Sequence, residues 1–274
     1  MKSFEYARPT TEAEALDLLG DHHADTAVLA GGTDLVGLLR ENLVAPERVV
    51  DIKHVSTLRG VTETLDGVLI GALTTLEELL ENPLLAGHRA IRDVADAHYA
   101  IQIQQNGTLG GDLCHLPNCW YFRGGYGLLG MDRGTSRVET GDNRYHAILG
   151  NAGPAKFVSA SRFAPALIAW GAKARIIGPR ADEEQWLPLE YFYQTPKTPK
   201  QGVTVLEPGQ LLAQIWLPHA GHSDSASYEV LELRGLDWPL AAASAWLGMS
   251  GGVVRDARIV MGHVAPVPWI AHQA

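Results

Sequence analysis

Two glycine-rich segments hold the residues with the clearest chemical potential in this sequence. They are LAGGTDL at residues 29–35 and NGTLGGDL at residues 106–113. Paired glycines let a backbone adopt positive φ and approach a ligand closely, because no Cβ intervenes. Successive backbone N–H groups in such a turn form a concave set of donors that suits an anion such as pyrophosphate. The candidate chemistry is therefore anion binding by backbone turns.

Each segment taken alone is ambiguous. A Gly-Gly pair in a chain with 29 glycines is most often an ordinary tight turn. Neither segment matches the G-x-G-x-x-G dinucleotide fingerprint or the phosphate loop that ends in G-K-[ST]. The aspartates Asp34 and Asp112 would repel a pyrophosphate, so we expect them to cap turns or helix starts, or to bind ribose hydroxyls.

Local patterns predict the elements that position the first segment. A capping box, Thr11-x-x-Glu14, opens a helix that Gly20 ends. Residues 27–30 form a short apolar strand, 34–40 a helix, and 49–52 a second strand. A strand, a glycine turn and a helix in this order bring backbone donors and a helix start to one point.

The second segment lies in a longer mixed region. We predict a strand at 68–71, a helix from the capping box Thr74-x-x-Glu77 through Leu80, and helices at 88–97 and 161–170. A strand is expected at 172–177, and 178–180 resembles a boundary. Later strand-like stretches lie at 211–217, 228–233 and 258–261. Residues 114–156 lack clear periodicity, and so long a loop inside a domain is usually functional or disordered.

Composition narrows the class of protein. The chain has 274 residues, 46% of them hydrophobic, and a net charge of −9. A nucleic-acid binder needs a basic face, so we expect no nucleic-acid partner. No apolar run reaches the roughly 18 residues of a membrane span, and the N-terminus has no apolar signal region. Two cysteines make no disulfide framework, which predicts a reducing, cytoplasmic location.

In this order, the two segments resemble the flavin-pyrophosphate loops of the FAD-binding medium subunits of the molybdenum hydroxylase, or xanthine dehydrogenase, family. The nearest type is that of the aldehyde oxidoreductases and 4-hydroxybenzoyl-CoA reductase. Further similar segments are FEYARP at 4–9, DNRYHA at 142–147, APAL at 164–167, LRGLDWP at 233–239 and GHVAPVP at 262–268.

The resemblance implies an α+β fold with a vanillyl-alcohol-oxidase-type FAD-binding domain of two α/β subdomains. These would span 1–54 and 55–177, with an insertion at 114–156, and an α+β domain at 178–274 would cover the isoalloxazine side. Family members continue past this point into further helices, so the last domain is either short or incomplete. The residues that the resemblance assigns to FAD are Leu29, Ala30, Gly31, Gly32, Thr33, Asp34, Leu35, Asn106, Gly107, Thr108, Gly110, Gly111 and Asp112.

The resemblance also implies a function. A large subunit with a molybdenum cofactor would oxidise a substrate, and a small iron–sulfur subunit would relay the electrons. FAD in this chain would pass them to an external acceptor such as NAD, oxygen or a quinone. The flavin would carry the chemistry, so no catalytic side chain is expected. The alternatives are a stand-alone flavin oxidase or dehydrogenase of the same fold, and a subunit that binds its partners without flavin.

Departures from the family pattern lie in and around the insertion. Some relatives hold a four-iron cluster there, which needs four thiolates. This sequence offers only Cys114 and Cys119, and positions near Met131, Gly141 and Ala155 hold none. We therefore predict no cluster and no metal site, His115 and His146 included, and a segment that is mobile or held by packing of Trp120, Tyr121 and Phe122. The chain also departs from residues common in relatives at Gln104, Gln105 and the segment from Ser159 to Arg162. We therefore expect its contacts to the far end of FAD to differ from the family pattern.

Overall fold

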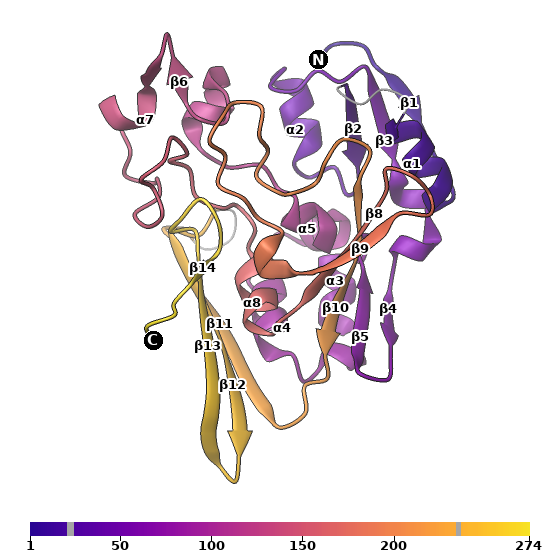
Figure 1. Cartoon of the computed structure of the whole chain (residues 1–274), viewed down its shortest axis with the longest axis vertical. Helices are drawn as coiled ribbons and strands as arrows, with labels where there is room; N and C mark the ends of the chain where they lie inside the picture. The colour runs from indigo at the N-terminus through magenta and orange to yellow at the C-terminus, as the bar shows by residue number, and fades with distance from the viewer. Residues whose placement is uncertain (21–24, 234–236) are drawn as a thin grey trace.

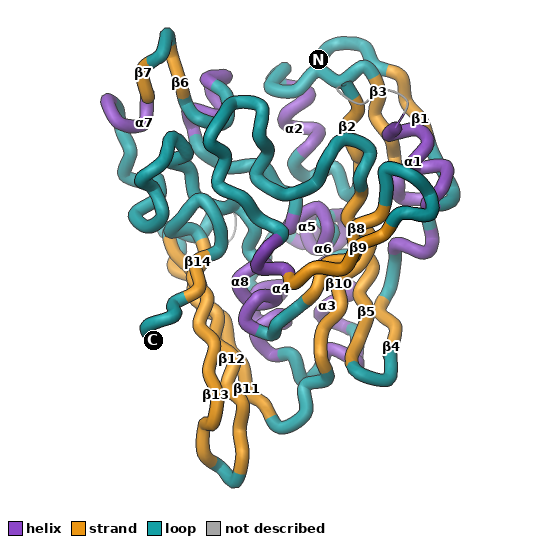
Figure 2. The backbone as a smooth tube through the Cα atoms, viewed as in Figure 1, coloured by secondary structure: helices purple, strands orange, loops and turns teal. Residues whose placement is uncertain are grey.

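A computed structural model describes residues 1–20, 25–233 and 237–274. Part of the similar segment at 233–239, namely residues 234–236, lies outside the described residues. The described chain forms three larger sheets and a small two-stranded one. Figures 1 and 2 show helices between the sheets and an irregular lobe to one side. Among the described helices, none has the length and apolar character that a membrane crossing requires.

The first sheet is small, parallel and close to the prediction. Its order is β1 (Glu5–Ala7), β3 (Arg48–Asp51), β2 (Thr26–Leu29), and α1 (Glu12–Gly20) and α2 (Leu35–Arg40) connect the strands. The hydroxyl of Thr11 accepts from the Glu14 N–H at 3.2 Å, as a helix cap should. Leu16 and Leu19 of α1 pack against Val50 in a shared core.

The second sheet is antiparallel, in the order β4 (Val61–Glu63), β5 (Gly67–Gly71), β10 (Leu211–Pro218), β8 (Lys173–Ile177), β9 (Glu184–Pro188). Helices cover it and fill the main core. They are α3 (Leu76–Glu81), α4 (Arg89–Asp96), α5 (Ile101–Asn106), α6 (Leu109–Leu113) and α8 (Phe163–Ala169). Short 3-10 turns lie at Ile52–His54, Ser56–Leu58, Pro83–Leu85 and Leu189–Tyr191.

Two local predictions were wrong in register or type. The capping box of α3 is Thr75 with Glu78, not Thr74 with Glu77, and its two hydrogen bonds measure 2.8 and 3.2 Å. Thr74 bonds to Gly60 instead, and the TTLEE sequence allows both frames. The second glycine segment is a turn only in its first part, because Thr108 caps the short helix α6 through the Gly111 N–H.

The third sheet has the order β11 (Ser223–Val230), β12 (Ala241–Ser250), β13 (Val253–Gly262), β14 (Trp269–Ile270). Its strands are antiparallel, and one face packs on α4 and α8. The long β12–β13 hairpin extends away from the rest of the molecule (Figure 1). Because β9 and β10 each pair with β8 in the second sheet, a division by sheets falls near residue 220, whereas the sequence places the boundary at 178.

The insertion at 114–156 is ordered around its own small core. It contains a π-helical turn (Phe122–Tyr126), the hairpin β6 (Met131–Asp132) and β7 (Thr135–Ser136), and α7 (Arg137–Thr140). Leu129, Ala155 and Phe157 are buried together. Phe122 is also buried, whereas Trp120 lies at the surface with its ring 5.4 Å from Tyr145. Packing therefore holds this segment, though Trp120 takes only an outer part in it.

Candidate functional site

The two glycine segments touch each other in the structure. A Cβ added to Gly31 would lie 1.8 Å from the backbone oxygen of Asn106. The second segment rests in turn on residues 72–76, because Leu109 donates to Thr74 O at 2.9 Å and Gly110 donates to Ala72 O at 2.8 Å. The fold thus brings together two turns that are far apart in the sequence.

The backbone donors of the two segments differ in availability. The N–H groups of Leu109, Gly110 and Gly111 all donate within the protein. In the first segment, by contrast, the N–H groups of residues 32–35 make no hydrogen bond to any described residue. The first segment therefore has a run of successive backbone donors to offer to an anion.

A cavity lies on each side of this pair of turns. One has a volume of about 480 Å³ and is lined by residues 30–35 together with Thr108, Gly110 and Gly111. The other has a volume of about 260 Å³, and its lining includes Asp112, His115 and Trp238. Three residues line both cavities, namely Thr33, Thr108 and Gly111.

Most of the residues assigned to the site line these cavities, but two do not. Gly107 and Asp112 line the smaller cavity. Leu29 ends strand β2, and Asn106 ends α5 with its side-chain amide donating to Gln102 O at 2.9 Å. Leu29 and Asn106 therefore support the turns without lining either cavity.

Contacts and backbone conformation within the protein already favour glycine at these positions, apart from any effect of a ligand. Gly32 has φ +77°, a conformation that favours glycine. A Cβ on Gly110 would lie 2.7 Å from the Cβ of Ala72, and one on Gly111 would lie 2.9 Å from Thr108 Oγ1. Close packing within the protein thus favours glycine at Gly110 and Gly111 before any ligand is considered.

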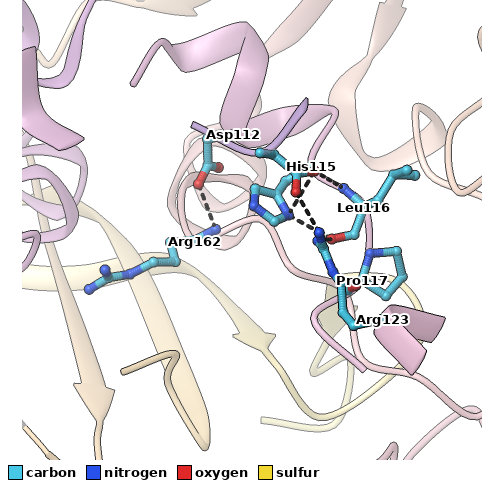
Figure 3. Close-up of polar contacts among 7 residues, drawn as sticks. Asp112, His115, Leu116, Pro117, Arg123 and Arg162 are labelled. Atoms are coloured by element: carbon cyan, nitrogen blue, oxygen red, sulfur yellow. Dashed lines mark hydrogen bonds and ion pairs between the residues drawn. The ribbon is translucent and has the colours of Figure 1, made fainter. Parts of the chain in front are cut away.

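Asp34 joins the first glycine segment to the insertion. Its carboxylate accepts from Arg123 Nη1 at 2.8 Å and from the Leu116 N–H at 3.2 Å. The same guanidinium donates to the carbonyls of Leu116 and Pro117, as Figure 3 shows. Asp34 makes no side-chain bond to the start of α2. No local pattern predicts this role for Arg123, which lies 89 residues away from Asp34.

Asp112 caps a helix start, as expected from the sequence. The helix is α8, however, and not the α6 in which Asp112 lies. Its carboxylate accepts from Ser161 Oγ at 2.5 Å, from the Arg162 N–H at 3.2 Å and from the Phe163 N–H at 3.1 Å. Both aspartates are therefore committed to contacts within the protein.

The smaller cavity is lined by the rings of two histidines and a tryptophan, near one buried ion pair. Burial lowers the pKa of His98 to about 4, and the Arg162 charge adds to this effect. Arg162, in the segment that departs from the family pattern, pairs with Glu229, and both side chains are buried. Trp238 closes the cavity with its ring 4.6 Å from that of His115. Sequence reasoning missed this ion pair and the role of Trp238 as a wall, although 233–239 was a similar segment.

The site fits FAD on these observations. A pyrophosphate needs hydrogen-bond donors, and residues 32–35 offer backbone N–H groups without a described partner. A dinucleotide extends to both sides of its pyrophosphate, and a cavity lies on each side of the turns. No group of three or more possible metal ligands is found among the described residues.

Comparisons with known proteins agree with this geometry. The sequence profile of the "FAD binding domain in molybdopterin dehydrogenase" matches residues 2–220. The carbon monoxide dehydrogenase medium chain of Hydrogenophaga pseudoflava is 27% identical over 268 residues, covering 96% of this chain and 75% of the relative. A putative xanthine dehydrogenase FAD-binding subunit of Escherichia coli K12 is 27% identical over 267 residues, with coverages of 96% and 75%.

A solved structure supports the same assignment. Reconstituted CO dehydrogenase from Oligotropha carboxidovorans superposes with a TM-score of 0.76 at 26% identity, covering 99% of this chain and 79% of that one. The expected α+β FAD-binding fold is thereby confirmed. The chain belongs to the FAD-binding medium subunits of the molybdenum hydroxylase-type dehydrogenases, and it is an oxidoreductase subunit whose cofactor is FAD.

Proposed function

We propose that this chain transfers electrons within a heteromeric molybdenum hydroxylase. A large subunit with a molybdenum cofactor would supply the electrons, and a small iron–sulfur subunit would relay them to this chain. The chain would then pass them to an external acceptor. The observation that carries the proposal is the run of available backbone donors at residues 32–35 between two cavities. Bound FAD would supply the redox chemistry, and the chain would bind and orient it.

The residues divide the work of holding FAD. The N–H groups of residues 32–35 and the Thr33 hydroxyl would hold the pyrophosphate, because none of them bonds to a described residue. The second segment would serve as a rigid floor, since the N–H groups of Leu109, Gly110 and Gly111 already donate within the protein. The full FAD site would still comprise all the residues that the sequence assigned to it, with Leu29 and Asn106 supporting the turns.

Expression with and without the partner subunits tests this proposal. The chain alone should retain FAD and turn over no metabolite, and it should co-purify with molybdenum and iron when the neighbouring subunits are produced with it. Robust oxidation of a metabolite by the chain alone would favour the stand-alone flavoenzyme. Colourless protein that still binds its partners would favour the subunit without flavin.

The cell compartment belongs to the same proposal. Cys114 and Cys119 are both free thiols. Burial raises the pKa of Cys114 to about 12, so this partly buried thiol stays protonated and unreactive at neutral pH. We place the complex in the cytoplasm on this basis, and fractionation of the native cells tests the placement.

A further inference from the structure

The space for a ligand is larger on the Trp238 side of the glycine turns than on the opposite side. The 260 Å³ cavity shares Asp237 and Trp238 with an adjoining cavity of about 770 Å³, which lies between the insertion and the C-terminal part of the chain. The cavity on the opposite side of the turns has about 480 Å³. The ribityl and three-ring half of FAD is longer and broader than the adenosine half. A cofactor whose pyrophosphate binds at residues 32–35 would therefore extend its flavin half toward Trp238.

His98 offers a hydrogen-bond acceptor to the 260 Å³ cavity, which it lines although it is only 8% exposed. Its Nδ1 lies 2.8 Å from the Val94 carbonyl oxygen, which can only accept, so Nδ1 carries the ring proton. Burial lowers the pKa of His98 to about 4, so the ring is neutral at pH 7. Nε2 therefore has a lone pair, and no described residue donates to it.

Arg162 offers a donor to the same cavity. It is 7% exposed, and it is the only cationic side chain among the described residues that line this cavity. Nε donates to the Glu229 carboxylate at 2.8 Å, and Nη2 donates to that carboxylate and, at 3.2 Å, to Ala97 O. Nη1 makes no hydrogen bond to any described residue. One edge of the guanidinium is thus held by Glu229, and the other remains available to a ligand.

These two nitrogens are not sealed inside the protein. The fully enclosed side-chain nitrogens without a hydrogen-bond partner, among the described residues, belong to His88, His146, Trp170, Trp246 and His263. His98 Nε2 and Arg162 Nη1 lack a described partner as well, yet neither is in this enclosed set. A ligand in the cavity that both residues line can therefore reach them.

A neutral acceptor beside a cationic donor is complementary to one edge of the flavin ring. The pyrimidine edge of the isoalloxazine carries an imide N–H between two carbonyl oxygens. The two carboxylates that line the cavity, Asp112 and Asp237, already accept hydrogen bonds from backbone N–H groups and cannot donate to a carbonyl. Arg162 is thus the charged side chain that suits a flavin carbonyl, and His98 suits the imide N–H.

We propose that His98 and Arg162 hold the pyrimidine edge of the flavin, with His98 Nε2 accepting from the imide N–H and Arg162 Nη1 donating to a neighbouring carbonyl oxygen. The Arg162 charge then raises the reduction potential of FAD, because reduction increases the electron density at that edge. Glu229 offsets part of this effect through its ion pair with Arg162. The inference rests on the proposed function, since it takes the pyrophosphate to bind at residues 32–35.

Methylation of the flavin at N3 tests the His98 contact without any change to the protein. Flavin-free protein is titrated with FAD and with FAD methylated at N3, and quenching of flavin fluorescence gives each Kd. The methyl group removes the imide N–H, so the wild-type chain should bind the analogue about tenfold more weakly. His98→Ala removes the acceptor and leaves room for the methyl group, so it should bind both cofactors alike. A wild-type chain without this preference, or a preference that His98→Ala retains, would overturn the contact.

The midpoint potential of bound FAD tests Arg162. Glu229→Gln leaves the guanidinium charge without its counter-charge and should raise the potential above that of the wild type. The double variant Arg162→Gln/Glu229→Gln should lie at least about 30 mV below Glu229→Gln, which is a tenfold change in the equilibrium constant of a two-electron couple. Arg175→Gln is the matched control, because it breaks an ion pair with Glu184 that lines none of the three cavities. Its potential should equal that of the wild type.

The outcomes separate this inference from the proposed function. A methylation penalty that depends on His98, with potentials that follow the charge of Arg162, supports the inference. Equal potentials in the cavity variants and the control would show that the flavin ring lies away from Arg162. FAD binding that responds to charge at residue 33 but not to N3 methylation would overturn the inference and leave the pyrophosphate site standing. A wild-type chain that binds no FAD would contradict the proposed function itself.

Discussion

Charge at residue 33 should control FAD affinity. Thr33 is exposed and lines both cavities beside the glycine turns. If residues 32–35 hold the pyrophosphate, Thr33→Glu places a carboxylate next to a group with two negative charges. Thr33→Gln has nearly the same size without the charge and serves as the matched control.

The expected penalty follows from Coulomb's law. Two unit charges about 5 Å apart repel by roughly 3 kcal/mol at an effective dielectric constant of about 20. Solvent reaches this exposed position and screens part of that energy. We therefore expect Thr33→Glu to bind FAD about 1.5–3 kcal/mol more weakly than Thr33→Gln, which is roughly a 10- to 100-fold difference in Kd.

Titration of flavin-free protein with FAD measures this difference through quenching of flavin fluorescence. Salt near 1 M shortens the Debye length to about 3 Å, so the gap between the two variants should narrow. Riboflavin, which has no pyrophosphate, should bind both variants alike. Equal FAD affinities for the two variants at low salt would refute the placement of the pyrophosphate at residues 32–35.

Three further predictions concern stability and metal content. Asp112→Asn should lower the free energy of unfolding by about 1–3 kcal/mol, because its carboxylate caps α8; an unchanged denaturation midpoint would contradict this role. His98 and His263 have folded pKa values of about 4 and 3, below the unfolded value near 6.5. Stability should therefore be constant above about pH 6.5 and fall below it, by about 4 kcal/mol at pH 5, and His98→Gln should remove about half of that loss. Anaerobic reconstitution with iron and sulfide should leave the chain free of iron, and stoichiometric iron that Cys119→Ser abolishes would show a cluster after all.

The first subdomain was predictable because its signals are local. The apolar run before Gly31 and the cap at Thr11 each lie within a few residues of the element that they define. The frame of α3 was missed by one residue, since two adjacent Thr-x-x-Glu pairs compete. In the frame that the structure adopts, with Thr75 as the cap, Leu76 and Leu79 are buried.

The strand β12 could not be predicted from its residues. Its sequence, AAASAWLGMS, is rich in alanine and carries little β-propensity. Pairing with β11 and β13 on both sides forms the strand, and small side chains let α8 pack closely on the sheet. Tertiary context therefore overrides local preference at this position.

The polar contacts of the site lay beyond sequence reasoning for a similar reason. The Asp34–Arg123 bond spans 89 residues, and Asp112 reaches α8 across 51. No periodic pattern encodes such a pair. The glycines were recognised, yet the contact between Gly31 and Asn106 appears only when both turns are placed.

The Asp34–Arg123 contact has a thermodynamic consequence for cofactor loading. The first glycine segment and the insertion share this ion pair, so ordering one favours the order of the other. A ligand at about a hundred times its Kd adds roughly 2.7 kcal/mol to the stability of the state that binds it. FAD held at the turn would extend that protection to residues 114–156, and an ordered insertion would in return raise the affinity for FAD. Through the Arg123 guanidinium, the insertion would thus help to retain the flavin, although it has too few thiols to hold a cluster.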